Sequence, residues 1–353
     1  MRIHYITGRS GAGKTERVYQ EIRTALENGE KRLILIVPEH FTLQAERTLI
    51  QKLDQPGILD AEVLSFSRLA YKVFNTVGGI AKTRINNQGR HMILRKLLDE
   101  LRDDLRVYRS VSARDGFIEK INDLLVELKR HDISPQMLYE QAEKEGNSGL
   151  LPDKLKDIAL VYDSFNKYLA DKYLDPEDEI NVLIERMEEA DFLKGARVWL
   201  DGFDYFTPRD IRVIDKLLAL VKSLTITFTI GDEETDTDLD IFKSHQLSLK
   251  KIRALAEARR IEEQFTYLSP YSNEEYIANK APEIRHLEQE IYKYPYRQYS
   301  GKVENLKVFA ANNLESETEM LAAQIISLVR EKGWRFNQIA VVTADMESYG
   351  SII

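Results

Sequence analysis

The sequence predicts an α/β protein built around a parallel sheet, and three observations lead to this class. Short apolar runs typical of buried strands alternate with amphipathic helical patterns in the first 85 residues and again after residue 190. A glycine-rich loop joins the first of these strands to the first helix. Between residues 86 and 190 strand patterns disappear and helical patterns replace them, which indicates an all-helical insertion.

The first part of the sheet is expected within residues 1–85. Strands are predicted over 3–7, 33–37 and 61–65, and helices over 14–28, 43–53 and 66–77. The segment 33–37 reads Leu-Ile-Leu-Ile-Val without a polar residue. Such a run is typical of a central parallel strand that is buried on both faces.

The middle of the chain is predicted to be helical before it returns to the sheet. Helices are expected over 91–105, 116–129, 155–173 and 178–190. Strands are expected over 196–200 and 224–230. The helix between these strands is expected to begin after Thr207, because Pro208 and Asp210 complete a capping pattern there.

A new unit is predicted near the end of the chain. A helix is expected over 241–258, and the tyrosine-rich stretch 270–300 is expected to be a linker. Strands over 306–310 and 338–343 should flank a helix over 316–332. Because two strands do not make a complete sheet, the sequence is interpreted as a piece that stops inside its last domain.

Composition limits the possible functions. The chain has 353 residues, 43% of them hydrophobic, as in globular proteins, and a net charge of −8 that gives no overall basic footprint. Local basic stripes at 84–106 and 250–260 mean that binding of a nucleic acid is not excluded.

The absence of cysteine excludes cysteine-ligated zinc, an iron–sulfur cluster and a thiol nucleophile from this chain. Since no apolar run approaches the roughly 20 residues of a membrane span, a cytoplasmic location without membrane contact is expected.

The strongest chemical signal is the segment 8–15. Its residues, Gly8, Arg9, Ser10, Gly11, Ala12, Gly13, Lys14 and Thr15, match G-x-x-x-x-G-K-[ST] in full, between a predicted strand and a predicted helix. Glycines allow backbone N–H groups to turn inward around phosphates, and the following helix directs its positive end at the same anion. Lys14 is expected to reach the β- and γ-phosphates, and the Thr15 hydroxyl to bind Mg²⁺, so the sequence predicts an ATP site.

Other interpretations of this segment stay open from its residues alone. It nearly fits the G-x-S-x-G nucleophile elbow of hydrolases, although Ala12 breaks that motif and Gly13-Lys14-Thr15 is left without a role. A small-molecule kinase of the P-loop type would also use this segment, and would phosphorylate its substrate without any dependence on DNA.

The six histidines show no metal-binding spacing, and each is expected to be a surface or core residue.

Four further stretches carry a family resemblance. They read VPEHFTLQAE at 37–46, SFSRLA at 65–70, WLDGFDYFTP at 199–208 and ESETEM at 315–320. With the segment 8–15 and in this order, they resemble the N-terminal part of AddB, a subunit family of the bacterial AddAB helicase–nuclease related to UvrD-type superfamily 1 helicases. The resemblance implies a RecA-like P-loop domain over 1–85 and 191–300, a helical insertion over 86–190, and the truncated beginning of a second RecA-like domain over 301–353.

The resemblance also implies a function. It implies participation in processing DNA double-strand ends for recombination repair, with the AddA subunit as heterodimer partner and contact with single- and double-stranded DNA. The full subunit of this family scans single-stranded DNA for a Chi sequence. The nuclease domain and the iron–sulfur cysteines of the family lie toward its C-terminus, and this cysteine-free chain has neither. No nuclease chemistry is therefore assigned to it.

Several residues bear on ATP hydrolysis. Asp201 follows an apolar strand where a Walker-B aspartate would orient Mg²⁺, although a turn-capping carboxylate is an alternative. Gly202 stands where a motor has a water-positioning glutamate, and no arginine occurs near Ala344 where the family often has one. The adenine-contacting glutamine motif does not fit into the seven residues before the loop. ATP binding with weak or no hydrolysis is therefore expected, and an active DNA-stimulated motor is the alternative.

The resemblance also supplies candidates for DNA contact. Residues that match single-stranded-DNA loops of related helicases are Phe41, Thr42, Ser65, Phe66 and Arg68. Aromatic faces stack on bases, while hydroxyls and arginine meet phosphates. A core position for Phe66 and a helix cap for Ser65 are the alternatives. Arginines in or near the helical insertion either add electrostatic contact or lie on a solvated face: Arg84, Arg90, Arg95 and Arg102. The tyrosines of 292–299 are interpreted as an edge strand or a partner-packing surface.

Overall fold

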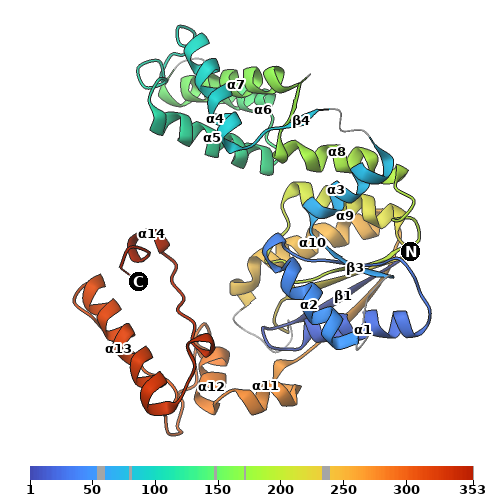
Figure 1. The fold of residues 1–353 in the computed structure, drawn as a ribbon, viewed down its shortest axis with the longest axis vertical. Helices are drawn as coiled ribbons and strands as arrows, with labels where there is room; N and C mark the ends of the chain where they lie inside the picture. The colour runs from blue at the N-terminus through green and yellow to red at the C-terminus, as the bar shows by residue number, and fades with distance from the viewer. Residues whose placement is uncertain (54–59, 79–81, 147–148, 171, 233–238, 353) are drawn as a thin grey trace. The chain divides into compact units, whose positions relative to one another are not determined.

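The computed structural model describes residues 1–53, 60–78, 82–146, 149–170, 172–232 and 239–352. The chain forms two compact units, one of residues 1–279 with 292–294 and one of residues 280–291 with 295–353. Figure 1 traces the elements of both units along the chain.

A six-stranded sheet lies at the centre of the first unit. Its strands are β1 (Arg2–Gly8), β2 (Leu33–Ile36), β3 (Ala61–Leu64), β6 (Arg197–Leu200), β7 (Ser223–Thr229) and β8 (Glu262–Tyr267). They follow the order β3-β2-β6-β7-β1-β8, and all pairings between them are parallel. The α/β class with a parallel sheet is thus confirmed, and the arrangement is consistent with a RecA-like domain.

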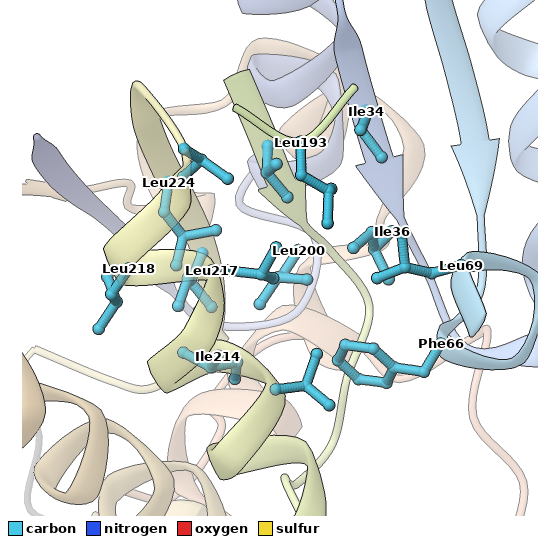
Figure 2. Packing of buried hydrophobic residues seen from close by; sticks show 14 of the residues in the cluster. Ile34, Ile36, Phe66, Leu69, Leu193, Leu200, Ile214, Leu217, Leu218 and Leu224 are labelled. Carbon is cyan, nitrogen blue, oxygen red and sulfur yellow. The ribbon is translucent and has the colours of Figure 1, made fainter. Parts of the chain in front are cut away.

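Helices cover both faces of this sheet. They are α1 (Lys14–Glu27), α2 (Thr42–Leu53), α3 (Phe66–Val77), α9 (Pro208–Leu220) and α10 (Lys243–Ala258), with α11 (Glu274–Asn279) after β8. Strand β2 is buried throughout: Ile34 and Ile36 join one apolar cluster, while Leu33 and Leu35 join the other. Figure 2 shows part of the first cluster, where residues of β2 and β6 lie among those of α3 and α9. The prediction of a central strand buried on both faces is confirmed.

The start of α9 has the capping pattern that the sequence predicts. The Thr207 hydroxyl oxygen accepts a hydrogen bond from the backbone N–H of Asp210 at 3.2 Å, and the Thr207 backbone N–H donates to the Asp210 carboxylate at 2.8 Å. We expect Thr207→Ala to destabilise the first unit by about 1 kcal/mol, because one of these cap bonds is lost. Thermal unfolding measures the effect. Thr207→Ser keeps the hydroxyl and should stay near the wild type, and equal losses for both variants would contradict this role.

A helical bundle with its own core is inserted into the first unit. Its helices are α4 (Asn87–Glu100), α5 (Asp115–Arg130), α6 (Pro135–Lys144) and α7 (Leu150–Leu169). Their apolar side chains form a separate cluster around Leu98, Leu125 and Phe165. The following helix, α8 (Glu179–Arg186), instead contributes Leu183 and Ile184 to a core cluster of the sheet. The sequence missed α6, a short helix with only two buried side chains.

The expected absence of strands between residues 86 and 190 is wrong in one place. Strand β4 (Thr83–Arg84) pairs in parallel with β5 (Tyr173–Leu174), where the chain enters and leaves the bundle. A ladder of two residues per strand is too short to produce an alternating apolar pattern, so nothing in the sequence marks it. The pairing ties the two ends of the bundle together.

The second unit differs from its sequence prediction. It contains α12 (Pro282–Glu290), α13 (Leu314–Lys332) and α14 (Met346–Tyr349). The strands predicted over 306–310 and 338–343 are wrong, since the described residues 280–352 contain no strand. A strand forms only where its backbone groups pair with a neighbouring strand, and these segments have none. The interpretation of 270–300 as a linker misses α11 and α12, and the described residues 292–299 form no edge strand.

Glu283 fastens α12 to the following segment. Its Oε1 atom accepts hydrogen bonds from the backbone N–H groups of Glu304 at 3.0 Å and Asn305 at 2.8 Å, and from the Asn305 side chain at 3.0 Å. Hydrogen bonds from the backbone N–H groups of Glu283 itself, Asn305 and Glu304 lower the pKa of Glu283 to about 2.

This pKa gives the attachment a pH dependence. Because the pKa of Glu283 is lower in the folded state, its stabilising effect is present above the ordinary carboxyl pKa of about 4.3 and is lost as the pH falls toward about 2. We expect the amide NMR signals of Glu304 and Asn305 to shift in this pH window. The shift should disappear in Glu283→Gln and remain in Glu331→Gln, which changes an exposed residue elsewhere in the unit. An unchanged titration in Glu283→Gln would contradict the assignment.

Candidate nucleotide site

The segment 8–15, the predicted phosphate loop, connects the carboxyl end of β1 to α1. Gly11 and Gly13 have φ angles of +81° and +87°, a left-handed conformation that favours glycine. Gly8 is closely approached by another part of the chain, since a Cβ atom there would lie 2.3 Å from the backbone oxygen of Leu268. The loop geometry therefore requires its glycines at these positions.

Lys14 places a positive charge inside this loop. Its ammonium group donates hydrogen bonds to the backbone oxygens of Gly8 at 2.7 Å and Arg9 at 2.9 Å. Burial lowers the pKa of Lys14 to about 8, and the nearby carboxylate of Asp201 acts in the opposite direction. The α1 N-terminus, which begins here, has no side-chain cap. A desolvated ammonium group and free helix amides are features that bind an anion.

Asp201 lies at the same edge of the sheet, directly after β6. Its side chain is buried, and its Oδ1 atom accepts a hydrogen bond from the Thr227 hydroxyl of β7 at 2.6 Å. Its backbone N–H donates to the Ile36 oxygen of β2 at 3.0 Å. Parallel strands meet with their carboxyl ends at one edge, so the sheet itself brings Asp201 toward Lys14.

The donor set fits a nucleotide and its Mg²⁺. The cradle has glycines where side chains would intrude, a lysine inside it and a buried carboxylate beside it. Within the described residues no group of three or more metal-ligating side chains could hold a metal ion alone. Thr15 and Asp201 are the residues that would hold Mg²⁺ together with the phosphates of a nucleotide.

The remaining residues of the predicted phosphate loop differ in the exposure of their side chains. Ser10 is exposed, whereas Ala12 is buried. Arg9 is only 2% exposed, and its guanidinium carbon lies 5.2 Å from the centre of the Phe242 ring. Its side chain is thus directed into the protein, so only the backbone of Arg9 is available to line a phosphate site.

The structure separates the predicted DNA-contacting residues into two groups. Ser65 is buried and caps α3 by accepting the Arg68 backbone N–H at 3.1 Å, and Phe66 belongs to the core. Thr42 is buried too, and its hydroxyl donates to the Glu39 backbone oxygen at 3.0 Å. Phe41 is 43% exposed, and Arg68 is exposed. Of the five, only Phe41 and Arg68 present side chains to a ligand.

The four arginines predicted to share a charged face do not behave alike. Arg84 pairs at 2.7 Å with Glu179, whose side chain is largely buried, Arg95 pairs with Asp115 at 3.2 Å at the surface, and Arg102 is exposed. The interpretation is wrong for Arg90, whose side chain is 5% exposed. Arg90 lies on the same face of α4 as the buried Leu94, Leu97 and Leu98, and its acidic partner lies far away in the sequence.

Arg90 belongs to a buried ion network in the helical bundle. The carboxylate of Asp175 accepts hydrogen bonds from the Arg90 guanidinium at 2.9 Å and the Lys129 ammonium at 2.8 Å. Lys129 also donates to Asp178 at 2.6 Å, and Arg90 donates to the Asn122 side chain at 3.0 Å. The side chains of Asp175 and Lys129 are 0% and 1% exposed. The network therefore joins α4 and α5 to the segment after β5.

His245 is buried, as the prediction of a surface or core position allows, and it lies close enough to Lys14 for the two to interact. It lies in the first turn of α10, and burial lowers its pKa, while Asp204 raises that pKa and Lys14 lowers it further. Its position near Lys14 depends on how α10 packs against β7, and no motif in the sequence encodes this packing.

No helix among the described residues is both long and apolar enough to cross a membrane.

Comparisons with known proteins agree with this architecture. The family model described as ADDB, N-terminal, matches residues 5–288. Among curated proteins, the chain is 48% identical to an ATP-dependent helicase/deoxyribonuclease subunit of Alkaliphilus oremlandii and 45% identical to that of Alkaliphilus metalliredigens. The protein of the same name from Acetivibrio thermocellus is 34% identical. Each match covers 100% of this chain and 31% of the relative, so the chain spans about a third of their length.

Proposed function

Since the chain belongs to the ADDB N-terminal family, we propose that it is the ATP-binding, single-stranded-DNA-contacting part of a helicase–nuclease subunit. In this proposal the subunit processes DNA double-strand ends for recombination repair, together with an AddA subunit. The family and the similarity to helicase/deoxyribonuclease subunits support the DNA-processing role. The geometry of the predicted phosphate loop supports the ATP-binding role.

One observation carries the proposal: the partly buried Lys14 lies inside a glycine cradle, and the buried Asp201 carboxylate at the end of β6 acts on it. The cradle adds a helix N-terminus without a side-chain cap, so its amides can receive a phosphate. A hydrolase elbow at Ser10 would require a base and an oxyanion site around that hydroxyl, whereas Ser10 is exposed. The nucleotide-binding role is therefore preferred.

We propose a scanning or regulatory role with weak or no hydrolysis. Gly202 follows Asp201, with a φ angle of +77°, so no side chain is present where a motor carries its glutamate. Asp204, the next carboxylate along the chain, is exposed. The second candidate is an active DNA-stimulated motor, which the complete loop and the buried Asp201 favour. An ATPase assay with and without single-stranded DNA separates them, since rapid turnover that Lys14→Ala abolishes would establish the motor.

The helical insertion is the part of the proposed domain division that has structural support. We propose a P-loop domain over 1–85 and 191–300, a helical insertion over 86–190 and the start of a second RecA-like domain over 301–353. The separate apolar cluster of α4–α7 and the β4–β5 pairing at the ends of the bundle support an insertion.

The proposed DNA contact uses the exposed Phe41 and Arg68. A ring that stacks on bases and a guanidinium that meets phosphates suit single-stranded DNA. Binding of single-stranded DNA should be measured with the chain alone and with AddA across a range of salt concentrations. We expect affinity to fall as salt rises, and Arg68→Ala to reduce the slope of that dependence. Affinity that is independent of salt would contradict phosphate contact.

A further inference from the structure

Helix α10 begins beside the predicted phosphate loop. The residue before it, Phe242, carries the ring that lies against the Arg9 guanidinium. The α10 N-terminus has no side-chain cap. One turn into the helix, the Ser248 hydroxyl accepts a hydrogen bond from the backbone N–H of Phe206 at 3.3 Å, which joins α10 to the loop that follows Asp201. The first turn of α10 is thus held between the two loops expected to surround the phosphates.

His245 is the side chain that this first turn contributes. It is 9% exposed, and its ring stands edge-on to Phe228, with ring centres 6.4 Å apart. Phe228 lies opposite Thr7 in the parallel pairing of β7 with β1, directly before the loop begins at Gly8. The imidazole is therefore beside the entrance of the loop.

The imidazole of His245 is polar, buried and without a hydrogen bond among the residues described here. The charged groups that act on it are Asp204 in the loop after β6 and Lys14 in the phosphate loop. Because burial is the largest influence and lowers the pKa of His245, the ring is neutral near pH 7 and carries one N–H donor. The ring is 9% exposed and its nitrogens are not among the fully buried unpaired atoms, so its N–H is available to donate to an incoming acceptor.

We propose that His245 is a specificity residue whose ring N–H donates to the terminal phosphate of the bound nucleotide, so that the site prefers a nucleoside triphosphate to a diphosphate. This inference rests on the proposed function, since it requires a nucleotide in the loop formed by residues 8–15. The backbone amides of the loop surround the inner phosphates, and Lys14 reaches the outer ones. The first turn of α10 lies against the loop through Phe242 and Arg9, and Lys14 acts on the His245 ring, so we assign this donor to the outer phosphate that Lys14 reaches.

The test compares two nucleotides in the full chain. The dissociation constants of ADP and of a non-hydrolysable ATP analogue are measured with Mg²⁺ for the wild type, His245→Phe and His245→Gln. Phenylalanine keeps the packing against Phe228 but removes the donor, so we expect the affinity for the ATP analogue to fall about tenfold with little change for ADP. Glutamine keeps an N–H donor and should restore most of the preference. His131→Phe, at an exposed site in the helical bundle, is the matched control.

The possible results distinguish a role of His245 from the proposed ATP site itself. A reduced preference for the ATP analogue in His245→Phe, with recovery in His245→Gln, supports the assignment. Equal losses for both nucleotides, or an unchanged ratio in both variants, would show a purely structural histidine and overturn it. Wild-type protein that binds neither nucleotide would overturn the proposed ATP site itself, whereas Lys14-dependent binding of both nucleotides with no effect of His245 would leave the site standing without this residue.

Discussion

Replacing Asp175 with alanine is expected to destabilise the helical bundle by about 3–5 kcal/mol, the range for breaking a buried ion pair. Asp175 is fully buried and accepts hydrogen bonds from both Arg90 and Lys129. Removal of the Asp175 carboxylate leaves two positive groups, the Arg90 guanidinium and the Lys129 ammonium group, without the buried negative charge that they share. The remaining carboxylate of Asp178 pairs only with Lys129, and it is 37% exposed.

Chemical denaturation of the chain measures this effect as a lower midpoint for the transition of the bundle. Asp163→Ala is the matched control, because Asp163 forms a surface pair with Lys167 on α7 and should cost at most about 1 kcal/mol. A double variant, Asp175→Leu with Lys129→Met, removes opposite charges together and should recover part of the loss. Similar midpoints for Asp175→Ala and Asp163→Ala would contradict the importance of the network.

Replacing Lys14 with alanine is expected to weaken ATP binding by about a hundredfold or more, as the loss of a desolvated charge contact to phosphate predicts. The Lys14 ammonium group lies within the loop cradle, where it donates hydrogen bonds to the backbone oxygens of Gly8 and Arg9. Fluorescence titration with a labelled ATP analogue measures the change.

The control for this prediction is Lys31→Ala, which removes the same side chain from an exposed position after α1. Its affinity for ATP should match that of the wild type. Because Lys14 also holds two loop oxygens, thermal unfolding of Lys14→Ala should be recorded alongside. Unchanged ATP affinity in a folded Lys14→Ala protein would remove the main support for a nucleotide site.

Much of the first unit could be predicted because its signals are local. The uninterrupted run of β2 and the cap at Thr207 depend on neighbouring residues alone, and the structure confirms both. The Ser65 cap, which the structure shows, was the alternative to a DNA contact. Strand β8 was missed because it lies at the sheet edge with mostly exposed, partly charged residues, and it therefore has no apolar pattern. An edge strand is recognised by its partner rather than by its composition.

The features that could not be predicted from the sequence depend on contacts between residues far apart in the chain. Arg90 shares the buried face of α4 with three leucines, and its partner Asp175 lies 85 positions away in the sequence. His245 enters the site only because α10 packs beside the end of β7. Phe66 matches a DNA-contacting pattern, yet the packing of α3 places it in the core. Motif and periodicity identify residue types, whereas tertiary packing decides which of those side chains a ligand can reach.

Amide hydrogen exchange of the chain with and without Mg·ATP tests the central claim most directly, because it reports on the loop amides themselves. We expect saturating Mg·ATP to slow exchange in the peptide that contains residues 8–15. In Lys14→Ala this protection should be lost, while the rest of the sheet keeps its exchange pattern. Exchange in that peptide that stays unchanged at saturating Mg·ATP, or protection that appears only elsewhere in the chain, would contradict a phosphate site built on Gly8, Gly13 and Lys14.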